Sequence, residues 1–174
     1  RNDTLWVGTW GGLNRSYGRE GFIPFKNEED NFNSLSNNVV FSIHRDKKGA
    51  LWIGTFNGLN RLDDEAGKKF KRFGEKEGLP NSAVYGILED KKGNLWISTN
   101  KGLCKFNPTD GSCRNYYFDD GLQSDEFNQG AFFTNRKGEL FFGGIDVFNI
   151  FDPGKLQYDP TVPTVVITNF FLAN

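Results

Sequence analysis

Short apolar segments alternate with glycine-containing turns along the chain, and one such segment returns at a regular interval. The recurring block has eleven residues: LWVGTWGGLNR from Leu5, LWIGTFNGLNR from Leu51, LWISTNKGLCK from Leu95 and a degraded LFFGGIDVFNI from Leu140. Its copies begin 46, 44 and 45 residues apart (51−5, 95−51 and 140−95). A period in the mid-forties built from short strands and glycine turns is typical of β-propeller blades, each a four-stranded sheet. The pattern therefore predicts an all-β fold, a partial β-propeller of four-stranded antiparallel blades.

A second repeated block precedes the first in each period and supplies a further strand. It occurs as LSNNVVFSIHRDKKG from Leu35, LPNSAVYGILEDKKG from Leu79 and LQSDEFNQGAFFTNRKG from Leu122. Each DKKG sequence has an aspartate where a turn begins and a glycine where the turn ends with positive φ. For the period that begins at residue 31 the pattern predicts strands at Val39–His44, Leu51–Thr55, Leu59–Leu62 and Phe70–Phe73. Apolar residues do not recur at helical spacing in the sequence.

The strand that opens each eleven-residue block is apolar on both faces. In LWIG, Leu51 and Ile53 point to one side and Trp52 to the other, as in a strand buried between two sheets. The sequence therefore predicts that Trp52 and Trp96 are buried between neighbouring blades. Gly54 follows at a place where we expect a side chain to meet the tryptophan of the neighbouring blade.

The repeats divide the chain into a propeller segment and a short C-terminal extension. Residues 1–157 are assigned to blades, with divisions 1–30, 31–77, 78–120 and 121–157, and residues 158–174 to a linker and the first strand of a following domain. The first blade starts at its second strand and the last fades after Phe151, which leaves about three and a half blades, fewer than the four to eight that close a ring. Together with the absence of methionine, this count predicts that the chain is a piece of a longer protein.

An arc of this kind leaves apolar blade faces uncovered, and exposed apolar patches favour association. We therefore expect the chain to form a homo-oligomer. The sheets can pair face to face, or the strongly β-forming segment 163–172 can be exchanged as an extra strand.

Composition and charge disfavour several classes of function. The formal net charge is −1, with 21 basic and 22 acidic residues interspersed, so no nucleic-acid partner is expected. No apolar run is long enough to cross a bilayer, and direct membrane contact is not expected. His44 is the single histidine, which excludes a histidine-based zinc site and disfavours an acid–base pair. Acidic residues at 28–30, 63–65 and 119–120 lack the spacing of a calcium loop, so neither metal nor cofactor is expected.

Cys104 and Cys113 are nine residues apart, a spacing unlike that of zinc or redox motifs. If the turn of the intervening hairpin centres near Pro108 and Thr109, the two cysteines lie opposite each other on adjacent strands and can form a disulfide. Two reduced, separately packed thiols are the alternative, and the sequence leaves both open.

One position departs from the repeat. Val147 takes the place held by Gly12, Gly58 and Gly102 in the other blocks, where the turn requires positive φ. Because a β-branched residue is strained in that conformation, we expect this turn to adopt another shape, with Gly143-Gly144 carrying the bend.

The segment GLPNSAVYGILEDKKGNLWISTNKGLCKF, from Gly78 to Phe106, resembles the regulator-propeller repeat of bacterial hybrid two-component systems. Its recurrence in phase makes the resemblance specific, and the resemblance covers nearly the whole chain. Asp152-Pro153 and the segment 163–172 resemble the passage into the immunoglobulin-like domain with a tyrosine-rich signature that follows such repeats. The resemblance implies the periplasmic sensor region of an inner-membrane receptor that detects products of polysaccharide breakdown. It implies no catalysis in this chain, since the kinase lies elsewhere in such receptors.

In antiparallel blades, the turns between second and third strands lie on the same face as the loops that enter each blade. This face carries the candidate ligand-binding residues Trp10, Phe56, Asn57, Asn100 and Lys101. Aromatic rings beside amides and a lysine suit an oligosaccharide, whose CH faces stack while its hydroxyls form hydrogen bonds.

Two alternatives to a ligand-sensing segment remain open. One is a purely structural or dimerisation segment of a propeller whose ligand binds elsewhere. The other is a fragment of a propeller glycosidase or lyase that gathers carboxylates from several blades.

Overall fold

Each eleven-residue block folds into two antiparallel strands joined by a tight turn. In the second copy, β5 (Leu51–Thr55) pairs with β6 (Gly58–Leu62), and Thr55 lies opposite Gly58. The turn places Gly58 at a φ of 113°, and a Cβ there would lie 2.6 Å from the carbonyl oxygen of Phe73. Both constraints select glycine, which explains why it recurs at positions 12 and 102, where φ is 131° and 97°.

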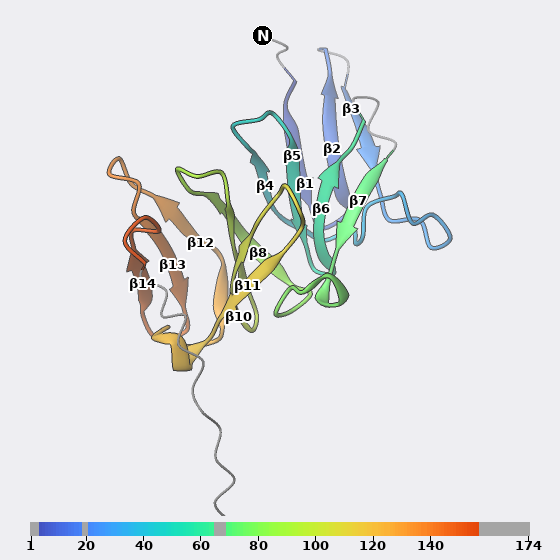
Figure 1. Ribbon diagram of the computed structural model, residues 1–174. Coiled ribbons are helices and arrows are strands. Elements are labelled where there is room, and N and C mark those ends of the chain that lie inside the picture. The colour runs from blue at the N-terminus through green and yellow to red at the C-terminus, as the bar shows by residue number, and fades with distance from the viewer. Residues whose placement is uncertain (1–3, 19–20, 65–68, 157–174) are drawn as a thin grey trace, which may run out of the picture.

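The computed structural model describes residues 4–18, 21–64 and 69–156. Within these residues, fourteen strands form four antiparallel sheets that stand side by side in an arc (Figure 1). The first sheet contains β1 (Trp6–Thr9), β2 (Gly12–Tyr17) and β3 (Gly21–Phe25). The second contains β4 (Val40–Arg45), β5, β6 and β7 (Phe70–Phe73). The last two contain β8 (Val84–Glu89), β9 (Leu95–Thr99), β10 (Gly102–Phe106) and β11 (Cys113–Tyr116), then β12 (Phe127–Thr134), β13 (Leu140–Gly144) and β14 (Phe148–Phe151). The predicted all-β, partial propeller is confirmed.

Neighbouring sheets are connected at one edge of the arc. Two one-turn 3₁₀ helices, η1 (Glu75–Glu77) and η2 (Phe118–Asp120), lead into the third and fourth sheets, and each ends at a left-handed glycine. The strands β1, β4, β8 and β12 of successive sheets contact one another and form the inner side of the arc. No helix in the described part of the chain is long and apolar enough to span a bilayer. The predicted linker and following strand at 158–174 lie outside the described residues.

The prediction that Trp52 and Trp96 are buried between blades is confirmed, with exposed fractions of 0% and 1%. Trp52 packs against the third sheet, with its ring centroid 5.5 Å from that of Phe106 in an edge-on arrangement. Trp96 packs against the fourth sheet, with its centroid 4.8 Å from that of Phe151. The same sequence position therefore fills two successive interfaces between sheets.

Each buried indole donates to the aspartate of the preceding DKKG turn, a contact that the sequence pattern did not reveal. Trp52 Nε1 lies 2.8 Å from Asp46 Oδ2, and Trp96 Nε1 lies 3.2 Å from Asp90 Oδ2. The other oxygen of each carboxylate accepts a backbone N–H four residues further on, at 2.8 Å and 2.9 Å. One buried aspartate therefore both closes the turn and satisfies the indole N–H.

In the third blade the hydrogen bonds also stabilise the charged form of Asp90. Burial raises the pKa of Asp90, but hydrogen bonds from Asn94, Trp96 and Lys92 outweigh that effect and leave the pKa below its ordinary value. Because the folded-state pKa is lowered, the stabilisation is present above the ordinary aspartate pKa and is lost as the pH falls through the folded-state value.

The fourth blade lacks both members of this pair. Phe141 stands where the other three blades have tryptophan, and Asn135 stands where the second and third blades have aspartate. Asn135 Oδ1 keeps the turn by accepting the backbone N–H groups of Lys137 and Glu139 at 2.9 Å and 3.1 Å. A phenyl ring has no N–H, so the carboxylate occurs only where an indole has to be satisfied.

The expectation that a side chain at position 54 would meet the tryptophan of the neighbouring blade was wrong. A Cβ at Gly54 would meet the hydroxyl of Ser42 in its own blade and Val84 of the next blade, 2.7 Å from both Cγ1 and the carbonyl oxygen of Val84, rather than a tryptophan. At the equivalent Gly8 a Cβ would lie 2.5 Å from Cγ1 of Val40. The glycine therefore admits the inner strand of the neighbouring blade, because the inner strands approach most closely there.

The turn of the last block takes another shape, as predicted. No described residue other than glycine has a positive φ, so Val147 is unstrained, and its carbonyl oxygen accepts the N–H of Gly144 at 2.9 Å. The role expected for Gly143-Gly144 was wrong. Both residues lie in β13 without positive φ, and the bend falls after them at residues 145–147.

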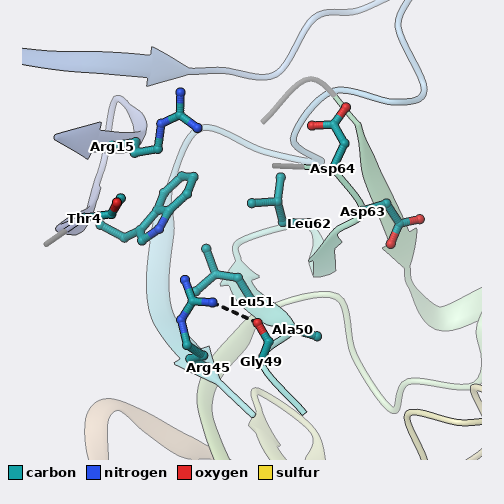
Figure 2. Close-up of a pocket in the computed structure, with 10 residues that line it drawn as sticks. Thr4, Arg15, Arg45, Gly49, Ala50, Leu51, Leu62, Asp63 and Asp64 are labelled. Carbon is teal, nitrogen blue, oxygen red and sulfur yellow. Dashed lines mark hydrogen bonds between the residues drawn. The ribbon is translucent and has the colours of Figure 1, made fainter. Parts of the chain in front are cut away.

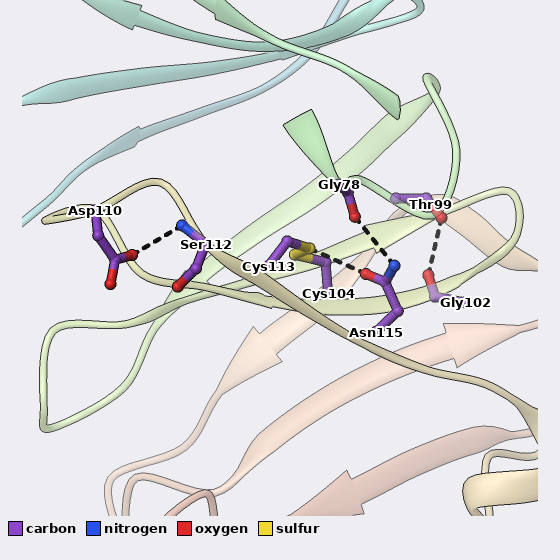
Figure 3. The surroundings of a disulfide bond; sticks show 8 residues. All are labelled: Gly78, Thr99, Gly102, Cys104, Asp110, Ser112, Cys113 and Asn115. Carbon is purple, nitrogen blue, oxygen red and sulfur yellow. Dashed lines mark hydrogen bonds between the residues drawn. A yellow bond between two sulfur atoms is a disulfide. The ribbon is translucent and has the colours of Figure 1, made fainter. Parts of the chain in front are cut away.

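Cys104 and Cys113 form a disulfide between β10 and β11, with Cα atoms 5.8 Å apart (Figure 3). The register differs from the predicted one. Cys104 lies opposite Asn115 and Cys113 opposite Phe106, so the cysteines are diagonal neighbours rather than direct partners. The hairpin is centred one residue later than expected, because residues 107–112 form the connection.

The disulfide replaces a polar contact that the neighbouring blades make. In the second blade Asn60 Oδ1 accepts the N–H of Ser36 at 2.9 Å, and in the fourth Asn149 Oδ1 accepts the N–H of Gln123 at 3.2 Å. The third blade has Pro80 at this place in the entering loop, and proline has no N–H to donate. Its partner position is Cys104, which is joined to the outer strand instead.

We expect Asp46→Ala and Asp90→Ala each to lower the free energy of unfolding by about 1–3 kcal/mol, because each leaves a buried indole N–H without an acceptor. Asn135→Ala is the matched control, since it removes equivalent turn hydrogen bonds without an indole. Its effect should be clearly smaller in equilibrium denaturation followed by tryptophan fluorescence. Equal losses for the three variants would contradict the role given to the indole contact.

Thiol titration of the denatured, unreduced chain should find no free thiol. Reduction should lower the free energy of unfolding by about 2.5 kcal/mol, as expected for a disulfide that closes a loop of about ten residues. The double variant C104S/C113S should match the reduced chain and be insensitive to reductant. Two titratable thiols in the unreduced chain would contradict the bridge.

Candidate functional site

The five residues predicted from the turns lie along the same edge of the arc. They occupy the β1–β2 turn (Trp10), the β5–β6 turn (Phe56 and Asn57) and the β9–β10 turn (Asn100 and Lys101). The β5–β6 and β9–β10 turns are each bound to the loop that enters the next blade. The N–H of Gly58 donates to the carbonyl oxygen of Ser82, and the N–H of Gly102 donates to the carbonyl oxygen of Asp125. The turns and the entering loops therefore form one continuous surface.

Two adjoining pockets open on this surface. The first, here called the aromatic pocket, has a volume of about 410 Å³ and is lined by Trp10, Val39, Phe41, Phe56, Tyr85, Asn100, Glu126, Phe127, Asn128 and Gln129. The second, the amide pocket, has a volume of about 460 Å³ and is lined by Asn37, Phe56, Asn57, Asn81, Ser82, Ala83, Tyr85 and Asn100. They share Phe56, Tyr85 and Asn100, so the structure brings together four of the five predicted residues. Lys101 lines neither pocket.

Aromatic rings from three elements meet between the two pockets. The centroid of Phe41 is 6.3 Å from that of Phe56 and 5.2 Å from that of Tyr85. The hydroxyl of Tyr85 donates to Oδ1 of Asn100 at 3.4 Å. Phe56 is 57% exposed and Trp10 is 76% exposed, although both are large apolar side chains. Exposed apolar clusters of this kind are typical of interaction surfaces and ligand-binding grooves.

The inner strands aim Phe41 and Tyr85 at the pockets through β-bulges. The register of β4 against β5 shifts between Val40 and Ser42, so Phe41 is the extra residue. The register of β8 against β9 shifts in the same way around Tyr85. A bulge redirects one side chain out of the alternation of the strand. Neither residue was predicted from the sequence, where the only signal is that an aromatic residue follows the same valine of the repeated block in both blades.

The fourth blade contributes polar groups to the same pocket through a larger irregularity. The register of β12 against β13 shifts between Phe127 and Phe132, which leaves residues 128–131 outside the regular ladder. Asn128 and Gln129 lie in this stretch and line the aromatic pocket, and Nδ2 of Asn128 donates to the carbonyl oxygen of Gly144 at 2.7 Å. Glu126, just before β12, also lines the pocket.

A larger cavity of about 740 Å³ lies between the first two sheets, at the ends of their strands near the DKKG turn (Figure 2). Its charged groups already interact: Arg15 lies over the ring of Trp6 at 5.8 Å, and Nη1 of Arg45 donates to the carbonyl oxygen of Gly49 at 2.8 Å. Leu62 lines it where the next interface has the larger Phe106. We interpret this cavity as a less completely filled interface between blades.

The single histidine lies away from both pockets, near the DKKG turns. Nε2 of His44 is 3.7 Å from Oε2 of Glu89, which also accepts the backbone N–H of Lys47 at 3.1 Å. Burial lowers the pKa of His44 and outweighs the opposing effect of Glu89. No group of three or more His, Cys, Asp or Glu residues suited to a metal ion occurs in the described part of the chain.

Comparison with known proteins identifies the repeats. Residues 34–57 and 78–101 match the family model described as "Two component regulator propeller". The comparison with curated proteins found no match.

The fold is that of solved propellers. The extracellular domain of BT3049 of B. thetaiotaomicron, described as a hybrid two component system, superposes with a TM-score of 0.68 at 23% identity over 97% of this chain and 29% of that one. The extracellular domain of BT4673 of the same organism, described as a one component system, gives 0.69 at 26% identity over 87% of this chain and 22% of the other. A catalytically inactive virginiamycin B lyase from Staphylococcus aureus, solved with quinupristin, gives 0.62 at 16% identity over 94% of this chain and 53% of the lyase.

The chain thus spans less than a third of the length of the two B. thetaiotaomicron domains that it resembles. The lyase, at its lower identity, shares the fold alone. In the second and third blades, the matched segments cover the whole block before the eleven-residue block and the first seven residues of the latter, including Phe56 and Asn100. The second and third blades therefore contain segments that match the two-component regulator propeller repeat, and the described residues fold as consecutive blades of a β-propeller.

Proposed function

We propose that this chain is part of the periplasmic sensor region of an inner-membrane two-component receptor, where it contributes to binding oligosaccharides released from polysaccharides. The segments that match the regulator-propeller repeat, and the likeness to extracellular domains of a hybrid two component system and a one component system, support the sensor role. The observation that carries the ligand class is the convergence of Phe56, Tyr85 and Asn100 between two adjoining pockets.

Aromatic rings next to amides match the surface of a sugar. The rings of Trp10 and Phe56 offer exposed faces on which the CH groups of a pyranose can stack. The amides of Asn57 and Asn100 can bond its hydroxyls, both as donors and as acceptors. Pockets of about 410 and 460 Å³ that adjoin provide room for more than one sugar unit.

The turns that present these groups are fixed before a ligand arrives. The hydroxyl of Thr55 donates to the carbonyl oxygen of Gly58 at 2.9 Å and accepts the N–H of Asn57 at 3.2 Å. Thr99 makes the same pair of contacts in the next blade, and its bond to Gly102 is drawn in Figure 3. A preorganised site loses little conformational entropy when it binds, which favours affinity.

The enzyme alternative has less support. A glycosidase uses two carboxyl groups that flank the scissile bond, whereas Glu126 is the one carboxylate among the described residues that line the two pockets. The likeness to virginiamycin B lyase concerns the fold alone. We therefore propose a non-catalytic role for this segment.

The disulfide between Cys104 and Cys113 is compatible with the oxidising periplasm.

We expect Phe56→Ala and Trp10→Ala to weaken oligosaccharide binding to the intact receptor by about tenfold each, because each removes a stacking surface. The measurement is isothermal titration calorimetry. Phe118→Ala is the control, since Phe118 is 61% exposed in η2 but lines neither pocket. If the receptor binds its ligand equally well with and without Phe56 and Trp10, the segment is structural and the ligand binds elsewhere.

We also propose that the chain associates with a second copy through the outer face of the fourth sheet. Phe133, Phe148 and Ile150 are 62%, 59% and 50% exposed there, around the ring of Phe141. In the second sheet the position equivalent to Phe148 is Leu59, which is fully buried by the third sheet. The fourth sheet therefore exposes an apolar face that, in the second sheet, is covered by the following sheet, and exposed apolar faces favour association.

Light scattering coupled to size exclusion should give a mass above the 19.7 kDa of one chain at micromolar concentration. Phe148→Lys should shift the population towards the monomer, because burying an unpaired charge in the contact is energetically unfavourable. Phe22→Lys, at an exposed position of the first sheet, should leave the mass unchanged. A wild-type chain that stays monomeric would refute the association.

A further inference from the structure

The walls of the two pockets carry charge of only one sign. Among the described residues that line the aromatic and amide pockets, Glu126 is the single charged side chain, and the other polar groups are neutral amides and hydroxyls. Lys101 is the only cation among the residues predicted to bind ligand, and it lines neither pocket. A ligand that enters would therefore meet a carboxylate without a compensating cation.

The backbone of Glu126 is held in place while its carboxylate is left available. Its N–H donates to the hydroxyl of Ser124 at 3.1 Å, and its carbonyl oxygen accepts from Nε2 of Gln123 at 3.4 Å. The carboxylate forms no hydrogen bond or ion pair with any residue in the described part of the chain. It is therefore available to a ligand in the pocket.

Three backbone N–H groups in the turns beside the pockets are already bonded within the protein. The N–H of Phe56 donates to the carbonyl oxygen of Val39 at 3.0 Å, and the N–H groups of Asn57 and Lys101 donate to threonine hydroxyls at 3.2 Å and 3.0 Å. Anion sites in turns rely on several free N–H groups that converge. These three N–H groups are therefore not available to an anionic ligand.

From these observations we infer that the pockets select neutral oligosaccharides over acidic ones, and that Glu126 is the residue that determines this selectivity. The inference rests on the proposed function and specifies its ligand class. Hydroxyl groups of a neutral sugar can donate to Glu126 and exchange hydrogen bonds with the amides. A uronate or sulfate group would instead be repelled by Glu126 and would lack the arginine or lysine that such groups are usually bound by.

The test is calorimetric titration of the intact receptor with a panel of paired oligosaccharides. Each neutral oligosaccharide is matched by an analogue of equal length in which uronate replaces a hexose, or sulfate a hydroxyl. We expect the ligands that bind to be neutral, and their acidic partners to bind at least about tenfold more weakly. The variant Glu126→Gln keeps the size of the side chain and removes its charge. In this variant the ratio of the dissociation constants of the acidic and neutral ligands of each pair should fall about tenfold. The control variant Asp119→Asn, at an exposed residue of η2 outside both pockets, should leave this ratio unchanged.

The outcomes separate the two proposals. Binding of neutral ligands that depends on Phe56, with a preference unchanged in Glu126→Gln, would overturn the role of Glu126 and leave the sensor function intact. An acidic ligand whose tight binding is lost in Phe56→Ala would overturn the selectivity itself. Absence of binding by the whole panel, or binding that is indifferent to Phe56, would refute the proposed ligand site and the selectivity with it.

Discussion

The packing of a tryptophan that is held by a buried aspartate, between the second and third sheets and again between the third and fourth, is the interaction on which the arc depends. Trp52 fills the space between the second and third sheets, and its indole N–H needs an acceptor in an otherwise apolar environment. Asp46 provides it from the turn that ends the inner strand, so turn closure and sheet packing are coupled. The coupling accounts for the fourth blade, in which Phe141 and Asn135 change together.

Because the apolar faces of the strands are used for packing between sheets, function has to be built from residues that escape the ladder. The turn residues Phe56 and Asn100 and the bulge residues Phe41 and Tyr85 are of this kind. They project from the same edge of the arc, where the entering loops fix the turns. The opposite ends of the strands are occupied by DKKG turns and the His44–Glu89 contact, which stabilise neighbouring blades instead.

Several features followed from the sequence alone because they depend on neighbours along the chain. The strand ranges Leu51–Thr55 and Phe70–Phe73 agree with the structure, since alternation and turn residues are local signals. The left-handed glycine at position 58 follows from the turn type, and the burial of Trp52 follows from a strand that is apolar on both faces. The position of Phe56 and Asn100 on one edge required only the alternation of antiparallel connections.

Only the tertiary structure decided the features that depend on register and on contacts between blades. A bulge at Phe41 cannot be inferred from alternation, because one extra residue in one strand shows only against its partner. The diagonal pairing of Cys104 and Cys113 was missed because a shift of one residue in the centre of the turn changes every opposite pair. Glu126 is 70 residues from Phe56 in sequence (126−56), and only the stacking of blades brings both into one pocket. The sequence thus determined the blades, and the three-dimensional arrangement determined the site, because its walls come from different repeats.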